Sequence, residues 1–322
     1  MNSWAPDVRP RVVVGPVAAF SGPGRFWRGN LHTHSAESDG ALSVEETVSR
    51  YRDAGYDFVA ITDHFRGEYG FPVTETSSFR SASFTTLLGA ELHAPRPEFS
   101  SEWHILAVGL PAGFSPPLPG ETGTQLARRA RQAGAFVGMA HPSASMLTEA
   151  DADSLDAAHA VEVYNALSVH EDRGDSWAFT DVLLTKGRRL STFAADDAHF
   201  QPQDPPGCAA WVQVRAVELT PASLLTALKA GRYYSSTGPM LETVEVLDSA
   251  ESGGESVRVV CSVARKVLVT GSRPGKQLVE GPGLTEATLP VSRYTGGYFR
   301  VTVEDAVGGR AWTNPIYLPA IT

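Results

Sequence analysis

Runs of apolar residues that end in polar residues recur along the first two thirds of the chain. Residues 26–34 and 57–64 are two such runs, and both end in histidine. The segment between them, residues 43–54, predicts a helix because Ser43 and Glu46 have the spacing of a capping box. Strand, helix and strand at this spacing predict a βαβ unit with buried parallel strands.

The same alternation continues to about residue 230. Apolar strands and helical segments follow one another, which is typical of a β/α barrel. The predicted strands 84–91 and 103–110 are separated by too short a gap for a crossover helix, so we expect them to be antiparallel. The further predicted strands are 11–20, 135–140, 160–165, 190–195 and 209–214, and the further predicted helices are 122–134, 176–186 and 221–230.

The pattern changes near residue 232, where short alternating segments stand between glycine and proline turns. Such segments predict an all-β region. They are residues 257–263, 267–270, 298–303 and 316–318. We therefore expect an α/β protein with two domains, a β/α barrel over residues 1–231 and a small β-rich domain over residues 232–322.

Composition and charge narrow the class of protein. The formal net charge is −9, whereas proteins that neutralise nucleic-acid phosphates carry a basic face, so we expect no nucleic-acid partner. Cys208 and Cys261 have no paired spacing, which favours a reducing compartment. No segment approaches the roughly 18 apolar residues of a membrane span, and residues 1–10 lack the pattern of a secretory signal. We expect a cytoplasmic protein with no membrane partner. Abundant alanine, arginine and glycine with little lysine indicate a bacterial source, and the oligomeric state has no signal in the sequence.

The candidate chemistry lies in six polar clusters, five of which directly follow predicted strands. His32 and His34 can approach one ion together, because residues i and i+2 of a strand point to the same side. Asp39 could reach the same ion or a second one. Each cluster alone has a structural alternative, since a lone histidine is often a hydrogen-bonded core residue and a lone aspartate can cap a helix. Together they predict a metal centre with nine candidate ligands: His32, His34, Asp39, His64, Glu91, His104, His141, Asp197 and His199.

These side chains are expected to meet at one face, because the carboxyl ends of the strands in a β/α barrel surround the active site. His104 lies at the start of its strand, and an antiparallel strand would bring it to the same face. Imidazole and carboxylate ligands without thiolates suit zinc, manganese or iron. The histidines His93 and His159 have no supporting context, so no function is predicted for them.

The motifs resemble those of the PHP (polymerase and histidinol phosphatase) family and occur in the family's order between about residues 28 and 200. They are His32-Thr33-His34 with Ser38-Asp39-Gly40, Ile61-Thr62-Asp63-His64, Gly89-Ala90-Glu91, Trp103-His104-Ile105-Leu106, Ala140-His141-Pro142 and Asp197-Ala198-His199. Flanking segments resemble the branch of this family that contains carbaryl-hydrolase-like proteins. Among them are residues 234–239 and 311–316.

The resemblance implies a distorted (β/α)7 TIM-like barrel. It also implies a trinuclear metal centre, with three ion positions of which two or three hold a divalent ion. By family motif, the first ion would be held by His32, His34, Glu91 and Asp197. The second would be held by Glu91, His104 and His141, so that Glu91 bridges two ions and is also a catalytic candidate. The third would be held by Asp39, His64 and His199. The family often has histidine where Asp39 stands, so occupancy of the third site depends on this aspartate.

Five further residues are candidates for catalysis or substrate binding. Asp63 could orient a ligand histidine or cap the next helix. Arg66 could clamp an anion, although a solvated loop arginine is the alternative. Tyr164 and Asn165 follow a strand on the expected active-site face and could bind substrate. His170 could donate a proton to a leaving group.

The leading functional hypothesis is a phosphoesterase acting on a small anionic molecule. Three divalent ions outweigh the three ligand carboxylates, so the pocket would be positive inside an acidic protein, and a metal-bridging hydroxide would attack the ester. One alternative is a carboxylester or carbamate hydrolase that uses the same centre. Others are a 3′-5′ exonuclease and a non-catalytic binding module. An amidohydrolase would need a strand-end lysine, and no lysine follows a candidate strand at that place.

Overall fold

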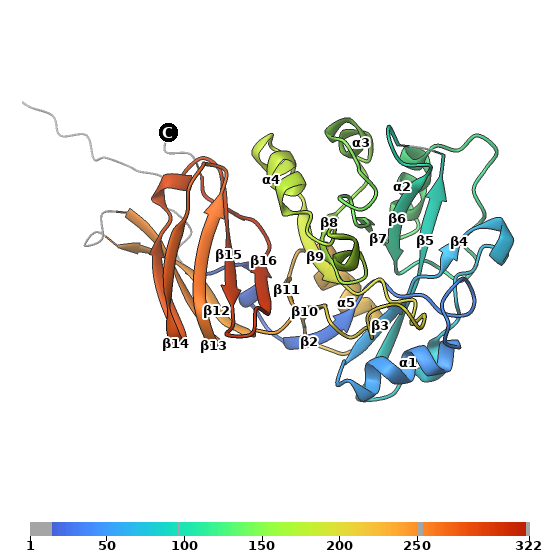
Figure 1. Ribbon diagram of the computed structural model, residues 1–322, viewed down its shortest axis with the longest axis horizontal. Coiled ribbons are helices and arrows are strands. Elements are labelled where there is room, and N and C mark those ends of the chain that lie inside the picture. Colours follow the sequence, from blue (N-terminus) through green and yellow to red (C-terminus); the bar gives the residue numbers. More distant parts are fainter. Residues whose placement is uncertain (1–14, 96, 250–253, 320–322) are drawn as a thin grey trace, which may run out of the picture.

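The computed structural model describes residues 15–95, 97–249 and 254–319. Figure 1 shows the β-rich strands β12–β16 at one end of an elongated molecule and the strands that alternate with helices at the other. The predicted N-terminal strand 11–20 lies partly outside the described residues, as do its three consecutive valines. Its described end forms the two-residue strand β1 (Gly15–Pro16) and the short helix η1 (Ala18–Phe20).

The β/α part follows the predicted order of elements. Its strands are β2 (Arg25–Asn30), β3 (Phe58–Ile61), β4 (His64–Phe65), β5 (Thr85–Ala94), β6 (Trp103–Val108), β7 (Phe136–Met139), β8 (Ala160–Asn165), β9 (Ser191–Ala195) and β10 (Trp211–Ala216). Its helices are α1 (Val44–Asp53), α2 (Gly123–Gln132), α3 (Glu149–Ser154), α4 (Trp177–Thr185) and α5 (Pro221–Lys229), with 3-10 turns η2 (Gly67–Tyr69), η3 (Ser77–Phe79) and η4 (Ser168–Glu171).

Helix boundaries follow local capping chemistry. Ser43 and Glu46 form the predicted capping box at the start of α1. Thr122 and Gln125 form another at the start of α2. The six-residue helix α3 was not predicted, because it contains too few apolar residues to show a helical period.

The sheet order of the β/α part is β10, β2, β3, β5, β6, β7, β8 and β9. Strands β2, β3 and β5 are parallel, and so are β7, β8 and β9. Strand β6 is antiparallel to both of its neighbours, which confirms the expected antiparallel pair. This reversal places the start of β6 beside the end of β5.

The barrel expected from the sequence is not closed. Strand β10 pairs with β2 in an antiparallel ladder from Arg25 to Gly29 and so occupies the edge of β2 that β9 would need. Among the described residues, β9 and β2 form no ladder, and contacts between them begin at their ends, with a β-bridge between Thr33 and Ala198 just beyond. The result is a mixed α/β fold in which the strands curve without forming a complete ring.

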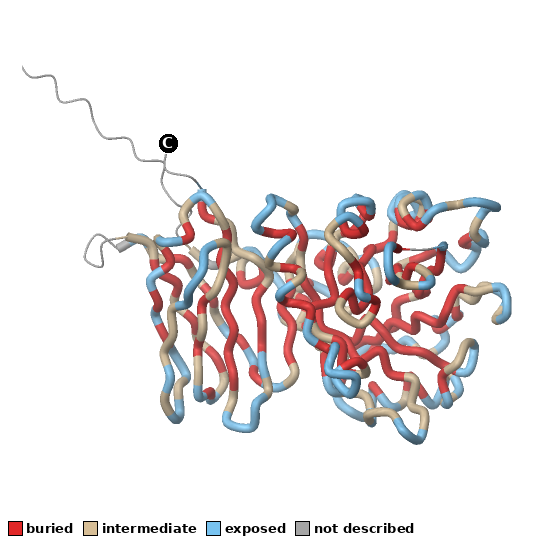
Figure 2. The backbone as a smooth tube through the Cα atoms, turned by 45° about the horizontal axis from the view of Figure 1, so that its top comes forward, coloured by how far each residue is buried: buried red, intermediate tan, exposed pale blue. Residues whose placement is uncertain are grey.

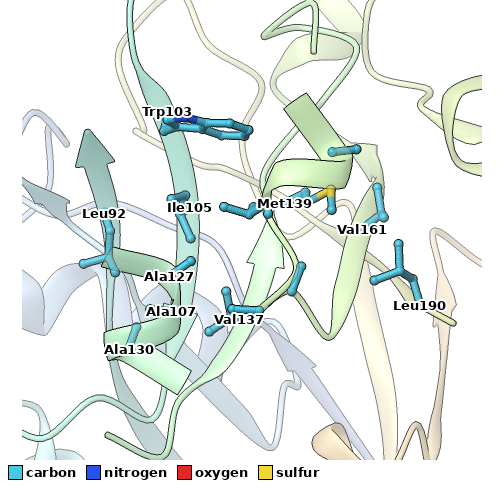
Figure 3. Close-up of a cluster of buried hydrophobic side chains, with 14 of the residues drawn as sticks. Leu92, Trp103, Ile105, Ala107, Ala127, Ala130, Val137, Met139, Val161 and Leu190 are labelled. Atoms are coloured by element: carbon cyan, nitrogen blue, oxygen red, sulfur yellow. The ribbon is translucent and has the colours of Figure 1, made fainter. Parts of the chain in front are cut away.

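The largest core cluster lies between the strands β5–β9 and the helices that cover them. Figure 3 shows Ala127 and Ala130 of α2 against Ile105 and Ala107 of β6. Small residues on the helix allow it to pack closely on the sheet, and the apolar side chains there are removed from water almost completely. Figure 2 shows that buried backbone follows the strands of both parts, while exposed residues gather in the connecting loops.

The C-terminal region is all β, as expected, but its strands differ from the predicted short segments. The runs 257–263 and 267–270 belong to one strand, β13 (Gly254–Gly271), which shifts register near Ala264. Its partner β14 (Gln277–Pro290) was not predicted, because Gly281-Pro282-Gly283 has the composition of a turn. The remaining strands are β11 (Tyr233–Ser236), β12 (Leu241–Ser249), β15 (Tyr298–Glu304), β16 (Arg310–Thr313) and β17 (Ile316–Tyr317), with the turn η5 (Ser292–Tyr294).

Contacts cross the sequence position at which we expect the domain boundary. Strand β11 pairs with β10 on one side and with β16 on the other. Ala19 and Phe20, from the start of the described chain, pack into the core of the C-terminal strands. The division at residues 231 and 232 stays a prediction. Among the described residues, no helix combines the length and apolar character needed to cross a bilayer.

Candidate metal centre

The loops that follow β2 and β9 lie side by side and are joined by backbone hydrogen bonds. The N–H of Asp197 donates to the carbonyl of His32, and the N–H of His34 donates to the carbonyl of Ala198. These bonds extend the neighbouring strands by a few residues, so the side chains of His32, His34 and Asp197 face one another. The ring Nε2 atoms of His32 and His34 lie 3.2 and 3.0 Å from Oδ1 of Asp197.

Glu91 lies at the centre of the cluster and is fully buried. Its Oε1 lies 2.8 Å from Nδ1 of His104 and 3.2 Å from Nε2 of His141. Its Oε2 lies 2.6 Å from Nδ1 of His64. One carboxylate therefore contacts histidines from three different segments of the chain.

A third group surrounds the side chain of Asp39, which is partly exposed. Its Oδ2 lies 3.3 Å from Nε2 of His64, and its Oδ1 lies 3.4 Å from Nε2 of His199. The ring of His199 stacks on that of His34 with centroids 4.1 Å apart. Asp39 is delivered by a tight loop in which Gly40 donates to the carbonyl of Ser35, and a Cβ at Gly40 would lie 2.7 Å from the backbone of His34.

The nine candidate ligands come together in overlapping groups whose donor atoms lie within 4.8 Å of one another. Among the described residues these groups include His34-Asp39-His64-His199, His32-His34-Glu91, His32-His141-Asp197 and Glu91-His104-His141. Three buried atoms of the nine candidate ligands make no hydrogen bond of good geometry, although charged atoms lie within 4 Å of each: Nε2 of His32, Nδ1 of His34 and Oε2 of Glu91. A buried polar atom without a partner is costly, and a divalent cation is the partner that this set of donors fits.

The electrostatics of the cluster show that its carboxylates need cationic neighbours. Burial disfavours charge on His32, but Asp197 and Glu162 outweigh it and raise the pKa of His32 well above its ordinary value. Burial alone would raise the pKa of Glu91, yet the histidines led by His104 hold that pKa well below its usual range. Divalent ions would take over this role, since histidine binds a metal only in its neutral form.

Two of the ligand residues have a backbone conformation that L-amino acids rarely adopt. The φ angle is +26° at His141 and +53° at Asp197. His141 lies two residues beyond the end of β7, and Asp197 lies two residues beyond the end of β9. At both places the chain turns toward the cluster. Backbone strain of this kind persists where the surrounding contacts fix the geometry, and it gathers at functional sites.

Glu162 and Asn165 hold the ligands in place, and the sequence did not predict this role. Oε1 of Glu162 lies 3.1 Å from Nδ1 of His32, and its Oε2 accepts from the N–H of His141. The amide of Asn165 donates to Glu162 and to Asp197, while its role in substrate binding stays a prediction. A glutamate inside the apolar strand 160–165 was the available signal, because a buried carboxylate needs partners.

His93 lies in the cluster, although the sequence predicted no function for it. Its Nε2 lies 2.8 Å from Nδ1 of His64, and the pair forms a metal-ligand group with Glu91. The signal was its position two residues after Glu91 on β5, which turns both side chains to the same face. Arg66 pairs with Glu102, whose second oxygen lies 3.5 Å from Nδ1 of His93.

Asp63 neither orients a ligand histidine nor caps a helix. Its Oδ1 accepts from the N–H of Ser35 and the hydroxyl of Ser38, and its Oδ2 accepts from the hydroxyls of Ser35 and Thr74. These four bonds fix the loop that carries Asp39. The buried carboxylate thus positions a candidate ligand through the backbone.

The variant Asp63→Asn is expected to weaken the metal group that contains Asp39 by about tenfold, because an amide cannot accept all four bonds. The groups around Glu91 should keep their ions. Metal titration followed by elemental analysis measures both, and Asp39→Asn should remove the same ion. Full metal content in Asp63→Asn, or loss of every ion, would contradict this role.

Tyr164 and His170 lie away from the cluster. The ring of Tyr164 packs against Trp312 of β16, with centroids 5.5 Å apart. His170 is exposed on η4, and among the described residues no hydrogen bond or ion pair joins it to a cluster residue. The structure therefore does not bring these two candidates to the site.

Comparison with known proteins identifies the fold. No family model matches the chain, and no curated protein matches it. A two-domain protein from Bacteroides vulgatus that contains a predicted PHP-like metal-dependent phosphoesterase is similar in structure, with a TM-score of 0.52 and 15% sequence identity. The similarity covers 97% of this chain and 100% of that chain. This chain shares its fold.

Two further solved structures have TM-scores below 0.5, and no conclusion is drawn from them. A candidate metal-dependent phosphoesterase from Bifidobacterium adolescentis has a TM-score of 0.39 at 18% identity and covers 54% of this chain and 89% of its own. An amidohydrolase from Chromobacterium violaceum with bound sulfate and no metal has a TM-score of 0.38 at 15% identity and covers 53% of this chain and 87% of its own.

A shared fold at 15% identity does not carry chemistry from one chain to the other. The function of this chain has to be inferred from its own side chains. Those side chains form a largely buried cluster of imidazoles and carboxylates, and several of its central atoms make no hydrogen bond.

Proposed function

We propose that the chain is a metal-dependent phosphoesterase that cleaves a small-molecule phosphate ester. The single observation that carries the proposal is that buried atoms of His32, His34 and Glu91 converge without hydrogen bonds at the meeting point of the candidate ligand groups. Two or three bound zinc, manganese or iron ions would supply the positive charge that binds a phosphate and activates water for attack.

The residues of the chain divide among three ion positions in this proposal. Glu91 contacts His104 and His141 through Oε1 and His64 through Oε2, so it is placed to join neighbouring positions. His32, His34 and Asp197 would complete the first position. Asp39 and His199 would complete the third together with His64.

Other side chains hold this arrangement rigid. Glu162 accepts from the backbone of His141 and faces the ring of His32, which fixes which ring nitrogen of His32 points to the centre. Asn165 donates to Asp197 and so fixes the orientation of that carboxylate. A site held in this way needs little reorganisation when substrate binds.

Arg66 is the cationic side chain that the sequence analysis named as a candidate for substrate binding. It is half-buried and already paired with Glu102 and Glu68. Binding of an anion would compete with these carboxylates. In this proposal Arg66 contacts the non-reacting part of the substrate and adds affinity rather than rate.

The test is elemental analysis of freshly purified protein combined with a hydrolase screen. We expect two to three divalent ions per chain. We also expect turnover of aryl phosphates that is lost in chelator and regained when the ion is restored. The screen should include phosphate monoesters, phosphate diesters, aryl carbamates and carboxylic esters.

Three outcomes would contradict the proposal. A consistent single ion would rule out a multinuclear centre. Faster turnover of aryl carbamates than of phosphates would favour the carbamate hydrolase, a second candidate supported by the resemblance of residues 234–239 and 311–316 to carbaryl-hydrolase-like proteins. Release of nucleotides from single-stranded DNA would favour an exonuclease instead.

A further inference from the structure

A cavity lies at the opposite ends of the strands from the metal cluster. It has a volume of about 470 Å³ and is lined by the loops before β8 and β9, the ends of α2 and α5, and the β16–β17 segment. His159 directly precedes β8, and Ser191 begins β9. At the other ends of these strands, β8 finishes at Asn165 and β9 leads into Asp197. The rise per strand residue therefore puts the cavity roughly 15–20 Å from the cluster.

The cavity is strongly cationic, although the chain as a whole has a net charge of −9. Arg131, Arg188, Arg189 and Lys229 line it. The one carboxylate of its lining, Asp156, is neutralised by Arg128, which donates to both of its oxygens at 2.9 and 2.6 Å. Arg188 pairs with Asp153, while Arg131, Arg189 and Lys229 add positive charge without such a pair among the described residues, and the resulting local field favours an anionic ligand.

The guanidinium groups differ in how many donors they leave free, since Arg188 already donates to the carbonyls of Ala152 and Leu155 and to Asp153. Arg131 donates once, to the carbonyl of Ala157, and so retains four of its five N–H donors. The guanidinium of Arg189 lies flat over Tyr317, 3.6 Å from the ring centroid. In the part of the chain that the structure describes, no carboxylate pairs with Arg131, Arg189 or Lys229.

His159 adds a neutral donor to these cations. Its Nδ1 accepts from the N–H of Val137, so the neutral ring carries its proton on Nε2. Burial, with help from the nearby charges of Arg131 and Lys229, lowers the pKa of His159 to about 4. The imidazole is therefore neutral at physiological pH, and its ring is fixed by stacking on Phe136.

We propose that this cavity is a second ligand site, which binds a small organic phosphate between the β/α part and the β16–β17 segment. Arginine forks match the oxygens of a phosphate, and the apolar side chains of Leu190 and Ile316 provide a wall for the organic part. The volume lies in the range of small-molecule sites. This inference does not depend on the chemistry of the metal cluster.

The test is calorimetric titration of the full-length, metal-free protein with pyrophosphate and with adenosine 5′-monophosphate. Both are expected to bind with a stoichiometry of one and to raise the melting temperature. The double variant Arg131→Gln with Lys229→Gln should weaken binding by about tenfold or more, because two charge-assisted contacts are lost. Arg52→Gln is the matched control, since Arg52 is also a basic residue in the last turn of a capped helix, outside the cavity.

Binding should be retained in Glu91→Gln, which alters the metal cluster alone. Circular dichroism of the double variant establishes that it is folded, and the single variants should each show part of the effect. Three results would overturn the proposal: no saturable binding of either probe, binding that Glu91→Gln abolishes and the double variant preserves, or equal affinity for citrate or uncharged adenosine.

Discussion

Glu91→Gln is expected to lose metal ions and to lower hydrolytic activity by on the order of 1,000-fold, more than the 10- to 100-fold typical for residues that only support a ligand. The carboxylate faces His64, His104 and His141 at distances of 2.6 to 3.2 Å. An amide keeps the size of the side chain but not its negative charge, and its nitrogen is a poor ligand. Loss of this one group should therefore affect two ion positions together.

Metal content per chain and the rate of phosphate-ester hydrolysis are the measurements. Glu45→Gln is the matched control, because Glu45 is exposed in the first turn of α1 and, among the described residues, no hydrogen bond or ion pair joins it to a candidate ligand. It should retain both metal and activity. If Glu91→Gln kept its ions and its activity, the assignment of Glu91 as the joining ligand would be wrong.

Asp196→Asn is expected to lower the free energy of unfolding by about 3–5 kcal/mol. The buried carboxylate accepts from the N–H groups of Cys208, Ala209 and Ala210 at 2.8 to 2.9 Å and from the hydroxyl of Tyr51 at 2.8 Å. An amide would turn its own N–H groups toward some of these donors and leave them unpaired. These bonds tie the loop after the β9 end to the loop before β10, so the loss is structural.

Urea unfolding in the presence of chelator separates this effect from metal binding. Burial raises the pKa of Asp196 to about 6, so the comparison belongs at pH 8, where the carboxylate is ionised. The exposed Asp53 at the end of α1 gives the control Asp53→Asn, which should change the unfolding free energy by less than about 0.5 kcal/mol. A change of similar size in both variants would contradict the role of Asp196.

Local features could be predicted because they depend on neighbours in the sequence. The capping box of Ser43 and Glu46 was predicted correctly, since a helix end is fixed by residues within one turn of it. The antiparallel arrangement of β5 and β6 was also predicted correctly, because the length of a connection restricts which strand pairs it can join. The C-terminal β region was recognised, but the lengths of its strands were not.

Features that depend on contacts across the fold were missed. The open ring results from the pairing of β10 with β2, and this competition for one strand edge leaves no pattern in either strand. His93 lacked a recognisable motif, although it lies beside His64. Asp63 was expected to contact a histidine or to cap a helix. Instead it accepts hydrogen bonds from Ser35 and Ser38, which lie in the loop that turns at Gly40, and from Thr74.

The sequence by itself determined the residue types and order of nine candidate ligands at strand ends, because strand periodicity and chain connectivity are local properties. Only the tertiary structure decided that Glu91 lies at their centre, that Glu162 and Asn165 hold them, and that a basic cavity lies at the far end of the same strands. These relations join residues that are from 13 to 130 positions apart in the sequence. Burial and charge act between such residues only after the chain has folded, so no local pattern records them.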